Sequence, residues 1–199
     1  MKIVPLGKSQ ETYSCNSYLI LGDWNRIEDV NTVIDPGVDG FIMEEIARLS
    51  TGFGKVPVQQ VILTHNHFDH SAGAAALRKA YGCRVLAFQE GPGVDQTLKG
   101  GQFLKAGDDF LEVLQTPGHS SDSISLYAPS LHALFSGDLP LRVRTPGGSF
   151  GCDYLAALQI LNRRKIDQIY SGHDEPLLSG GGAMIEQTIR NVLASRISG

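Results

Sequence analysis

The chain has 199 residues, of which 42% are hydrophobic, and its 17 lysines and arginines stand against 21 aspartates and glutamates, for a formal net charge of -4. This length and apolar content suffice for a substantial core, and we expect one domain over residues 1–199. Because acidic residues outnumber basic ones, the sequence gives no reason to expect a positively charged surface that would attract nucleic acid. Its N-terminus does not resemble a signal peptide, and it has no apolar segment long enough to span a bilayer. We therefore expect a cytoplasmic protein without nucleic-acid or membrane partners.

The first half of the chain alternates apolar strands with amphipathic helices. Its expected elements are strands over 2–6, 17–21, 32–34, 56–64 and 84–87, and helices over about 40–50 and 72–81. The third strand must end at Asp35-Pro36-Gly37, because proline lacks a backbone donor and glycine tolerates a left-handed turn. Ile42, Ile46 and Leu49 recur at helical spacing, which predicts a helix packed on a sheet.

The second half continues in the same manner after a loop rich in glycine, over 91–101, for which we expect mobility. Its expected elements are strands over 110–114, 123–127, 133–136 and 168–171, and helices over 155–161 and about 184–195. The three cysteines, Cys15, Cys83 and Cys152, are scattered without metal-type or redox spacing, so we expect buried free thiols.

Four of these strands are followed at once, or after a short turn, by a residue that can bind metal. These residues are His65, His119, Asp138 and His173. Loops at one edge of a sheet bring residues that are distant in sequence into a common cleft. The pattern therefore predicts one site assembled from most of the chain.

The densest of these loops reads His-Asn-His-Phe-Asp-His over residues 65–70. Three imidazoles and a carboxylate are costly to bury unpaired, but Zn²⁺ and its first-row neighbours accept them as ligands. In an extended loop His65 and His67 point the same way, while Asp69 and His70 come from the turn into the next helix and can face a second ion. The loop therefore indicates half of a two-metal site.

Five short motifs, taken in chain order, resemble those of a known protein family. They are the loop at 65–70, Pro117-Gly118-His119, Ser136-Gly137-Asp138 and Ser171-Gly172-His173, preceded by Asp35-Pro36-Gly37. Together they resemble the metallo-β-lactamase superfamily, especially its glyoxalase II-like hydrolases. The resemblance implies an α/β fold, a four-layered αβ/βα sandwich of two mixed β-sheets with helices on the outer faces. It also implies His65, His67 and His119 on a first metal, Asp69, His70 and His173 on a second, and Asp138 as the bridge.

On this reading the protein is a dinuclear metal-dependent hydrolase whose metal-bridging hydroxide cleaves a small ester, thioester or lactone. Two Zn²⁺ are the expected cofactors, with Fe or Mn as alternatives, and Asp69 and Asp138 are the expected catalytic residues. Asp35 is a candidate acceptor for a ligand imidazole N–H, or equally a plain turn aspartate. Arg142 and Arg144 are candidates for binding an anionic part of a small-molecule substrate, against the alternative of a solvated loop.

Other readings stay open. Persulfide dioxygenases share the family's fold and hold a single iron on residues that align with His65, His119 and Asp138, so a mononuclear iron sulfur dioxygenase is the alternative. A metal-stabilised binding module with a degenerate site is a third. Glyoxalase II carries a helical C-terminal domain, whereas one helix is expected after His173 here, which argues against glutathione thioesters. His132 is expected to be a surface or structural histidine. Oligomeric state and substrate stay open.

Overall fold

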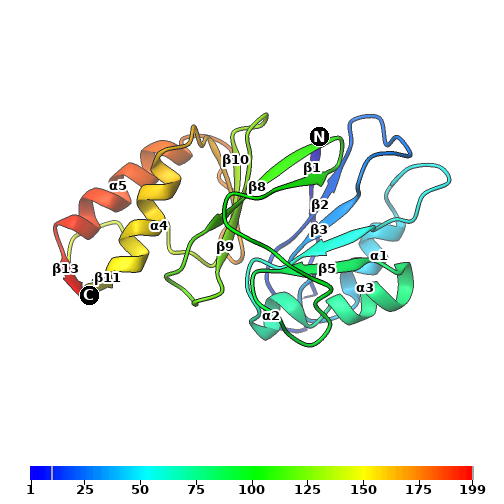
Figure 1. Ribbon diagram of the computed structural model, residues 1–199, viewed down its shortest axis with the longest axis horizontal. Helices are drawn as coiled ribbons and strands as arrows, with labels where there is room; N and C mark the ends of the chain where they lie inside the picture. The colour runs from blue at the N-terminus through cyan, green and yellow to red at the C-terminus, as the bar shows by residue number, and fades with distance from the viewer. Residues whose placement is uncertain (10, 199) are drawn as a thin grey trace.

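The computed structural model describes residues 1–9 and 11–198. The chain folds into two β-sheets stacked face to face, with helices on both outer sides (Figure 1). The first sheet has the order β1-β2-β3-β4-β5-β6, with β1 (Lys2–Leu6), β2 (Ser17–Leu21), β3 (Thr32–Ile34), β4 (Gln60–Ile62), β5 (Arg84–Ala87) and β6 (Gln96–Thr97). The second has the order β12-β10-β9-β8-β7, with β12 (Gln168–Ser171), β10 (Ala133–Gly137), β9 (Ile124–Ala128), β8 (Asp109–Gln115) and β7 (Phe103–Ala106).

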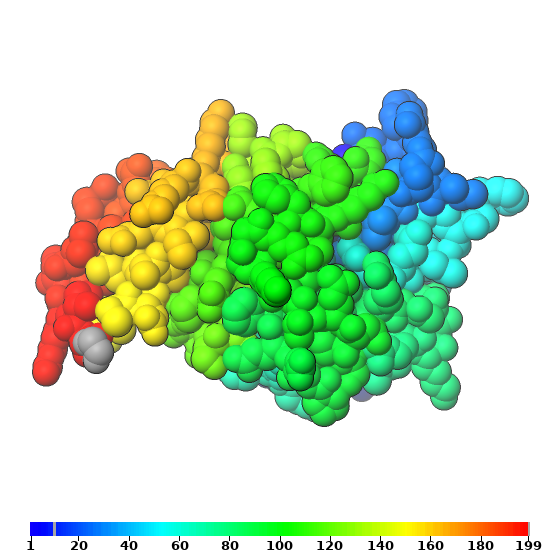
Figure 2. All heavy atoms as spheres, in the orientation of Figure 1, coloured from blue at the N-terminus to red at the C-terminus, as the bar shows by residue number. Residues whose placement is uncertain are grey.

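Helices cover each sheet from outside. They are α1 (Phe41–Ala47), α2 (Phe68–Ser71), α3 (Ala74–Tyr81), α4 (Cys152–Asn162) and α5 (Gly181–Leu193). In Figure 2 the yellow and red atoms of the segment that carries α4 and α5 form one end of the molecule. A short parallel pair, β11 (Ser149–Gly151) and β13 (Arg196–Ser198), joins the ends of this segment. Within the described residues, every helix is too short or too polar to cross a membrane.

Successive side chains of a strand pack into different layers of the core. In β2, Ile20 faces the core between the sheets, while Leu19 belongs to the core under α1 and α3. In β10, Phe135 faces the inter-sheet core and Leu134 packs under α4 and α5. Successive strand residues point to opposite faces, so a strand that is apolar on both faces must be covered on both. Burial of each such side chain stabilises the fold by about 2 kcal/mol. The predicted four-layered sandwich is confirmed.

Strand direction gathers the loops at one edge. β3, β4 and β5 run parallel in the first sheet, and β10 and β12 run parallel in the second. Two backbone hydrogen bonds join the sheets at this edge: the Ile124 N–H donates to the Thr64 carbonyl at 2.9 Å, and the Asn16 N–H to the Gly172 carbonyl at 2.6 Å. The loops that follow β4, β10 and β12 therefore meet.

Some expected elements differ from the observed ones. The strand predicted over 56–64 is only Gln60–Ile62, because the Gln59 and Gln60 N–H groups both donate to the Asn31 carbonyl and start the pairing there. The helix predicted over 72–81 is preceded by the separate helix α2 and begins at Ala74. At Gly73 a Cβ would lie 2.6 Å from the Pro36 carbonyl oxygen, so the chain turns where only glycine fits.

Strands β6, β7, β11 and β13 were not predicted, although β7 alternates exposed and buried residues as a strand should. The three cysteines are free, as expected, but Cys152 is exposed. The single domain over 1–199 stays a prediction, and its last residue, Gly199, lies outside the described residues.

Candidate metal centre

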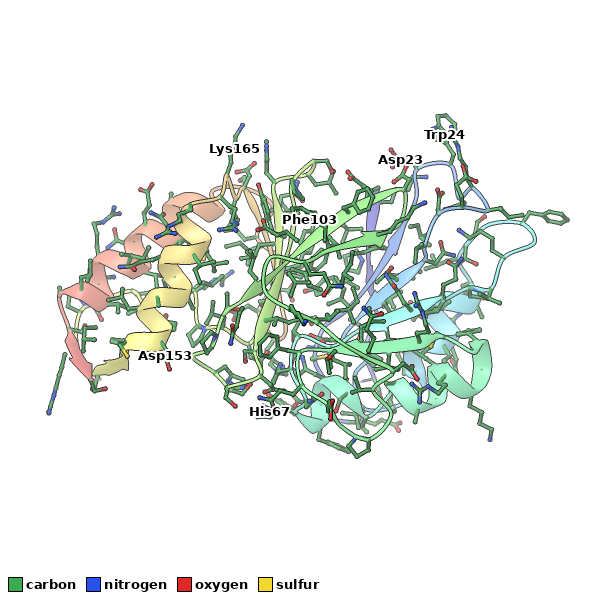
Figure 3. All side chains as sticks on the ribbon, in the orientation of Figure 1. Asp23, Trp24, His67, Phe103, Asp153 and Lys165 are labelled. Carbon is green, nitrogen blue, oxygen red and sulfur yellow. The ribbon has the colours of Figure 1, made fainter. Side chains whose placement is uncertain are left out.

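Two clusters of ligand-type side chains lie at the sheet edge described above. One contains His65, His67 and His119, and the other contains Asp69, His70, Asp138 and His173. In each cluster the candidate ligand atoms all lie within 4.8 Å of one another. His67 lies beside α2 at the lower edge of the molecule in Figure 3. The fold therefore brings together all seven residues that the sequence proposed as ligands.

Three buried polar atoms at this place have no hydrogen-bond partner among the described residues: Nε2 of His65, Nε2 of His70 and Oδ1 of Asp138. His65 is 1% exposed and His70 is fully buried, so water does not replace the missing partners freely. Buried polar groups are almost always paired, and an unpaired cluster points to an ion or water that belongs there. The residues therefore fit a bound cation.

The distances between side chains fit the same interpretation. Two ligands on one tetrahedral zinc ion lie about 3.3 Å apart, given metal–nitrogen bonds of about 2.05 Å. His67 Nδ1 and His119 Nε2 are 2.9 Å apart in the first cluster. In the second, His173 Nε2 lies 3.0 Å from Asp69 Oδ2, and His70 Nε2 lies 3.2 Å from Asp138 Oδ1. These three pairs are thus close enough to share an ion.

Asp138 connects the two clusters. Its Oδ2 lies 3.6 Å from His119 Nε2 and 3.9 Å from His65 Nε2, both in the first cluster. The same oxygen lies 3.5 Å from His173 Nε2 in the second. Asp138 follows β10 directly, where Gly137 takes a left-handed backbone conformation that turns the chain into the site. A carboxylate in this position can serve both clusters.

Asp35 lies behind His70. Its Oδ2 accepts hydrogen bonds from His70 Nδ1 at 2.9 Å and from the Thr64 hydroxyl at 2.7 Å, while Oδ1 accepts from the Thr64 N–H at 2.7 Å. An ionised carboxylate only accepts, so Nδ1 of His70 carries a proton, which leaves Nε2 as the nitrogen that can face a metal ion. The left-handed backbone of Asp35 (φ 51°) aims the carboxylate at this position.

The electrostatics follow from burial and from these pairs. Burial lowers the pKa of His65 to about 4, which keeps its imidazole neutral, as a metal ligand must be. Burial raises the pKa of Asp138, but the close approach of His70 Nε2 and the charge of His70 outweigh it and hold the pKa at about 2. Burial lowers the pKa of His70, and Asp35 and Asp138 outweigh that effect and raise it. Both carboxylates favour a proton on His70, so a metal ion competes with that proton.

The turn that carries His119 is fixed by Asp122, which sequence reasoning did not identify. Asp122 Oδ2 accepts from the Asn66 N–H at 2.8 Å, and Oδ1 accepts from the Ser120 hydroxyl at 2.7 Å. Asp122 is 8% exposed. These hydrogen bonds connect the turn that carries His119 to the histidine-rich loop. The available signal was the Ser-Ser-Asp-Ser run after His119, whose side chains favour capped turns.

Tyr13 is a second residue that the sequence did not reveal. Its ring stacks on His173, with centroids 5.1 Å apart and an interplanar angle of 16°. Its hydroxyl lies 3.5 Å from His173 Nε2. The segment before β2 carries no metal-type motif, so nothing in the sequence placed this ring near a histidine 160 residues away. His132, by contrast, precedes β10 and so lies at the opposite end of that strand from Asp138, outside both clusters.

Gly172 offers a direct test of the centre. A Cβ at this position would lie 2.2 Å from Asp138 Oδ1 and 2.7 Å from His70 Cε1. We expect Gly172→Ala to separate these ligands and to weaken metal binding by roughly 10–100-fold. Metal competition titrations would measure this. Gly151→Ala is the matched control, because its Cβ meets no atom within 4 Å. Equal affinity in the two variants would contradict the proposed geometry.

A cavity of about 320 Å³ opens beside both clusters. His119, Asp138 and His173 line one side of it, and the segment 139–143 lines another. Arg142 is part of this lining. Arg144 instead lines a separate hollow against α5. Of the two arginines proposed from the sequence, the fold thus brings Arg142 to the candidate centre and leaves Arg144 outside the cavity.

Comparison with known proteins gives the family. A model of the "Metallo-beta-lactamase superfamily" matches residues 11–94 and 86–173. A hydroxyacylglutathione hydrolase of Mesorhizobium japonicum is 26% identical over 172 residues, which are 82% of this chain and 65% of that protein. One from Bradyrhizobium sp. (strain ORS 278) is 29% identical over 57% of this chain and 48% of its own length. The chain thus spans about half to two thirds of these relatives.

Solved structures agree with the fold. ETHE1 from Myxococcus xanthus superposes with a TM-score of 0.71 at 21% identity, over 96% of this chain and 83% of that one. At this identity the likeness concerns the fold alone. The family model is more specific, because its two matched segments contain all seven candidate ligands and the sheet edge that presents them. The chain belongs to the metallo-beta-lactamase superfamily.

Proposed function

We propose that this protein is a dinuclear metallohydrolase that cleaves a small ester, thioester or lactone. The observation that carries the proposal is the position of the Asp138 carboxylate, whose oxygens lie 3.2–3.9 Å from histidine nitrogens of both clusters. The names of the relatives support a hydrolase. Because the chain spans only part of their length, their own substrate does not transfer directly.

In this proposal each side chain has a defined task. His65, His67 and His119 would hold the first ion, Asp69, His70 and His173 would hold the second, and Asp138 would serve both. Bound there, the ions supply Lewis acidity and activate a water molecule at neutral pH. Zinc suits the mixed imidazole and carboxylate donors, and iron and manganese accept the same set.

The chain's own residues orient the reaction. Asp69, whose Oδ2 lies 3.0 Å from His173 Nε2 in the second cluster, would accept a hydrogen bond from the attacking water and orient it toward the substrate carbonyl. Asp35 keeps the proton of His70 on Nδ1, so that Nε2 is available to the ion. Water adds to the acyl carbon, the bond to the leaving oxygen or sulfur breaks, and the released proton passes to that leaving group.

The second candidate is a mononuclear iron sulfur dioxygenase, which consumes molecular oxygen. It is favoured by the positions of His65 and His119, whose Nε2 atoms both lie within 3.9 Å of Asp138 Oδ2. Two histidines and one carboxylate are the ligand set of many non-haem iron oxygenases. The intact second cluster favours the hydrolase instead, since Asp69, His70 and His173 have no task in a one-iron site.

Metal content separates the two candidates. We expect about two ions per chain, predominantly zinc, in protein purified without a metal-binding tag, because both clusters are preorganised. Elemental analysis measures this directly. The protein should then hydrolyse members of a panel of esters, thioesters and lactones. One iron per chain, with oxygen uptake on a persulfide, would replace the hydrolase by the dioxygenase.

A further inference from the structure

The cavity beside the metal centre has a wall with mixed chemistry. It consists of residues 139–143, which follow Asp138 directly. Pro140 is exposed and Val143 half-buried, so they supply the accessible apolar surface of this wall, and Leu139 and Leu141, 4% and 6% exposed, lie packed in it. Arg142 follows Leu141 directly on the same segment, and its side chain is 37% exposed. Whatever lies against this wall meets alkyl surface and one guanidinium group.

The wall is held in place from behind by α4 and α5. The Tyr154 hydroxyl of α4 donates to the Pro140 carbonyl. On α5, the Thr188 hydroxyl donates to the Leu141 carbonyl at 2.6 Å and the Asn191 amide to the Val143 carbonyl at 2.7 Å. Thr188 and Asn191 are 1% and 6% exposed, and polar side chains are rarely buried to this degree. Their hydrogen bonds fix an irregular segment that has no strand partners, which is the preorganisation a binding surface needs.

Arg142, in contrast, is held only loosely. Its Nε lies 3.8 Å from Asp174 Oδ2, and its Nη2 donates to the Glu175 carbonyl at 3.4 Å. The Asp174 side chain is 60% exposed, and ion pairs of this kind contribute little. A guanidinium has five donors in a planar fork that matches a carboxylate. Most of the fork is therefore free to meet an anion at the cavity rim, and ions held at the centre would offset the charge of Asp138, which lines the same cavity.

We propose that the segment 139–143 binds the acyl part of the substrate and that Arg142 selects acyl groups that end in a carboxylate. The substrate class is then an ester or thioester of a dicarboxylic acid small enough for a cavity of about 320 Å³. This assignment rests on the proposed hydrolase function. It goes beyond that function by naming the charge of the acyl group that the cavity accepts.

The test compares two acyl groups that differ by one carboxylate, adipoyl and hexanoyl, as thioesters of the same thiol. The metal-loaded protein should show a KM at least roughly tenfold lower for the adipoyl thioester, as expected for one charged hydrogen-bonded contact. Arg142→Gln should raise the KM for the adipoyl thioester by about that factor, leave kcat within about twofold and leave the hexanoyl thioester unaffected. Arg142→Lys should keep part of the preference, because the charge remains.

Calorimetric binding of the products, adipate and hexanoate, gives a readout that does not depend on turnover. The matched control is Arg190→Gln on α5, because Arg190 makes an exposed ion pair of the same 3.8 Å length with Glu186. It should leave the adipate preference unchanged. If the wild type shows no preference, or if Arg142→Gln retains it, the proposal is overturned. If adipate binding depends on Arg142 but neither thioester is cleaved, the carboxylate site stands and the hydrolase function falls.

Discussion

Asp138→Ala is expected to lower kcat/KM for any hydrolysable ester by about a thousandfold or more. The reason is that its carboxylate lies between both clusters, so its loss removes a ligand from each proposed ion at once. Losing several kcal/mol of transition-state stabilisation corresponds to this factor, since each 1.4 kcal/mol is about tenfold. Metal content should fall by at least one ion per chain, as measured by elemental analysis.

The fold of the Asp138→Ala variant should persist, because the side chain follows a strand whose pairing does not involve it. Circular dichroism checks this. The control is His132→Ala, which removes the one histidine outside the clusters. His132 contributes through its backbone carbonyl, which accepts from the Asp167 N–H at 2.8 Å, so metal content should stay near wild type. An active Asp138→Ala variant, or loss of an ion in His132→Ala, would mean that the ligands are assigned to the wrong residues.

The candidate ligands could be found from the sequence because their positions follow from strand chemistry. His65, Asp138 and His173 come directly or closely after apolar strands. Parallel strands in each sheet end at the same edge, so residues that follow them must lie close together whatever the details of the loops. The four-layered fold followed from the same strands, since Leu19 and Ile20 are both apolar and so require cover on both faces.

The supporting residues could not be found in this way, because each acts through a contact between distant segments. Tyr13 stacks on His173, and Asp122 accepts from the backbone of Asn66. Thr188 and Asn191 hold a loop almost fifty residues earlier in the chain. None of these pairs has a fixed sequence spacing. For the same reason the sequence did not separate Arg142 from Arg144, of which the fold brings only Arg142 to the cavity beside the centre.

Asp35→Ala is expected to have the largest effect on stability. Asp35 is 2% exposed and accepts three hydrogen bonds, from His70 and from the backbone and hydroxyl of Thr64. Its removal leaves these donors buried without a partner, and removing one member of a buried charged pair costs about 3–5 kcal/mol. Alanine also tolerates the left-handed backbone less well than aspartate does. Urea unfolding of the metal-free chain should show a lower free energy of unfolding by that amount.

Asp35→Asn separates the two tasks of this residue. The amide keeps the shape and one acceptor, so the stability loss should be smaller, but the negative charge that fixes the His70 proton on Nδ1 is gone. Metal affinity should then fall by roughly 10–100-fold. The control is Asp29→Asn, because Asp29 is also 2% exposed and accepts from the Arg26 N–H at 2.6 Å in a loop between β2 and β3, outside both clusters. That variant should lose stability and keep its metal affinity. If both asparagine variants bind metal as the wild type does, Asp35 is a turn residue only, and the orientation of His70 must come from the packing around it.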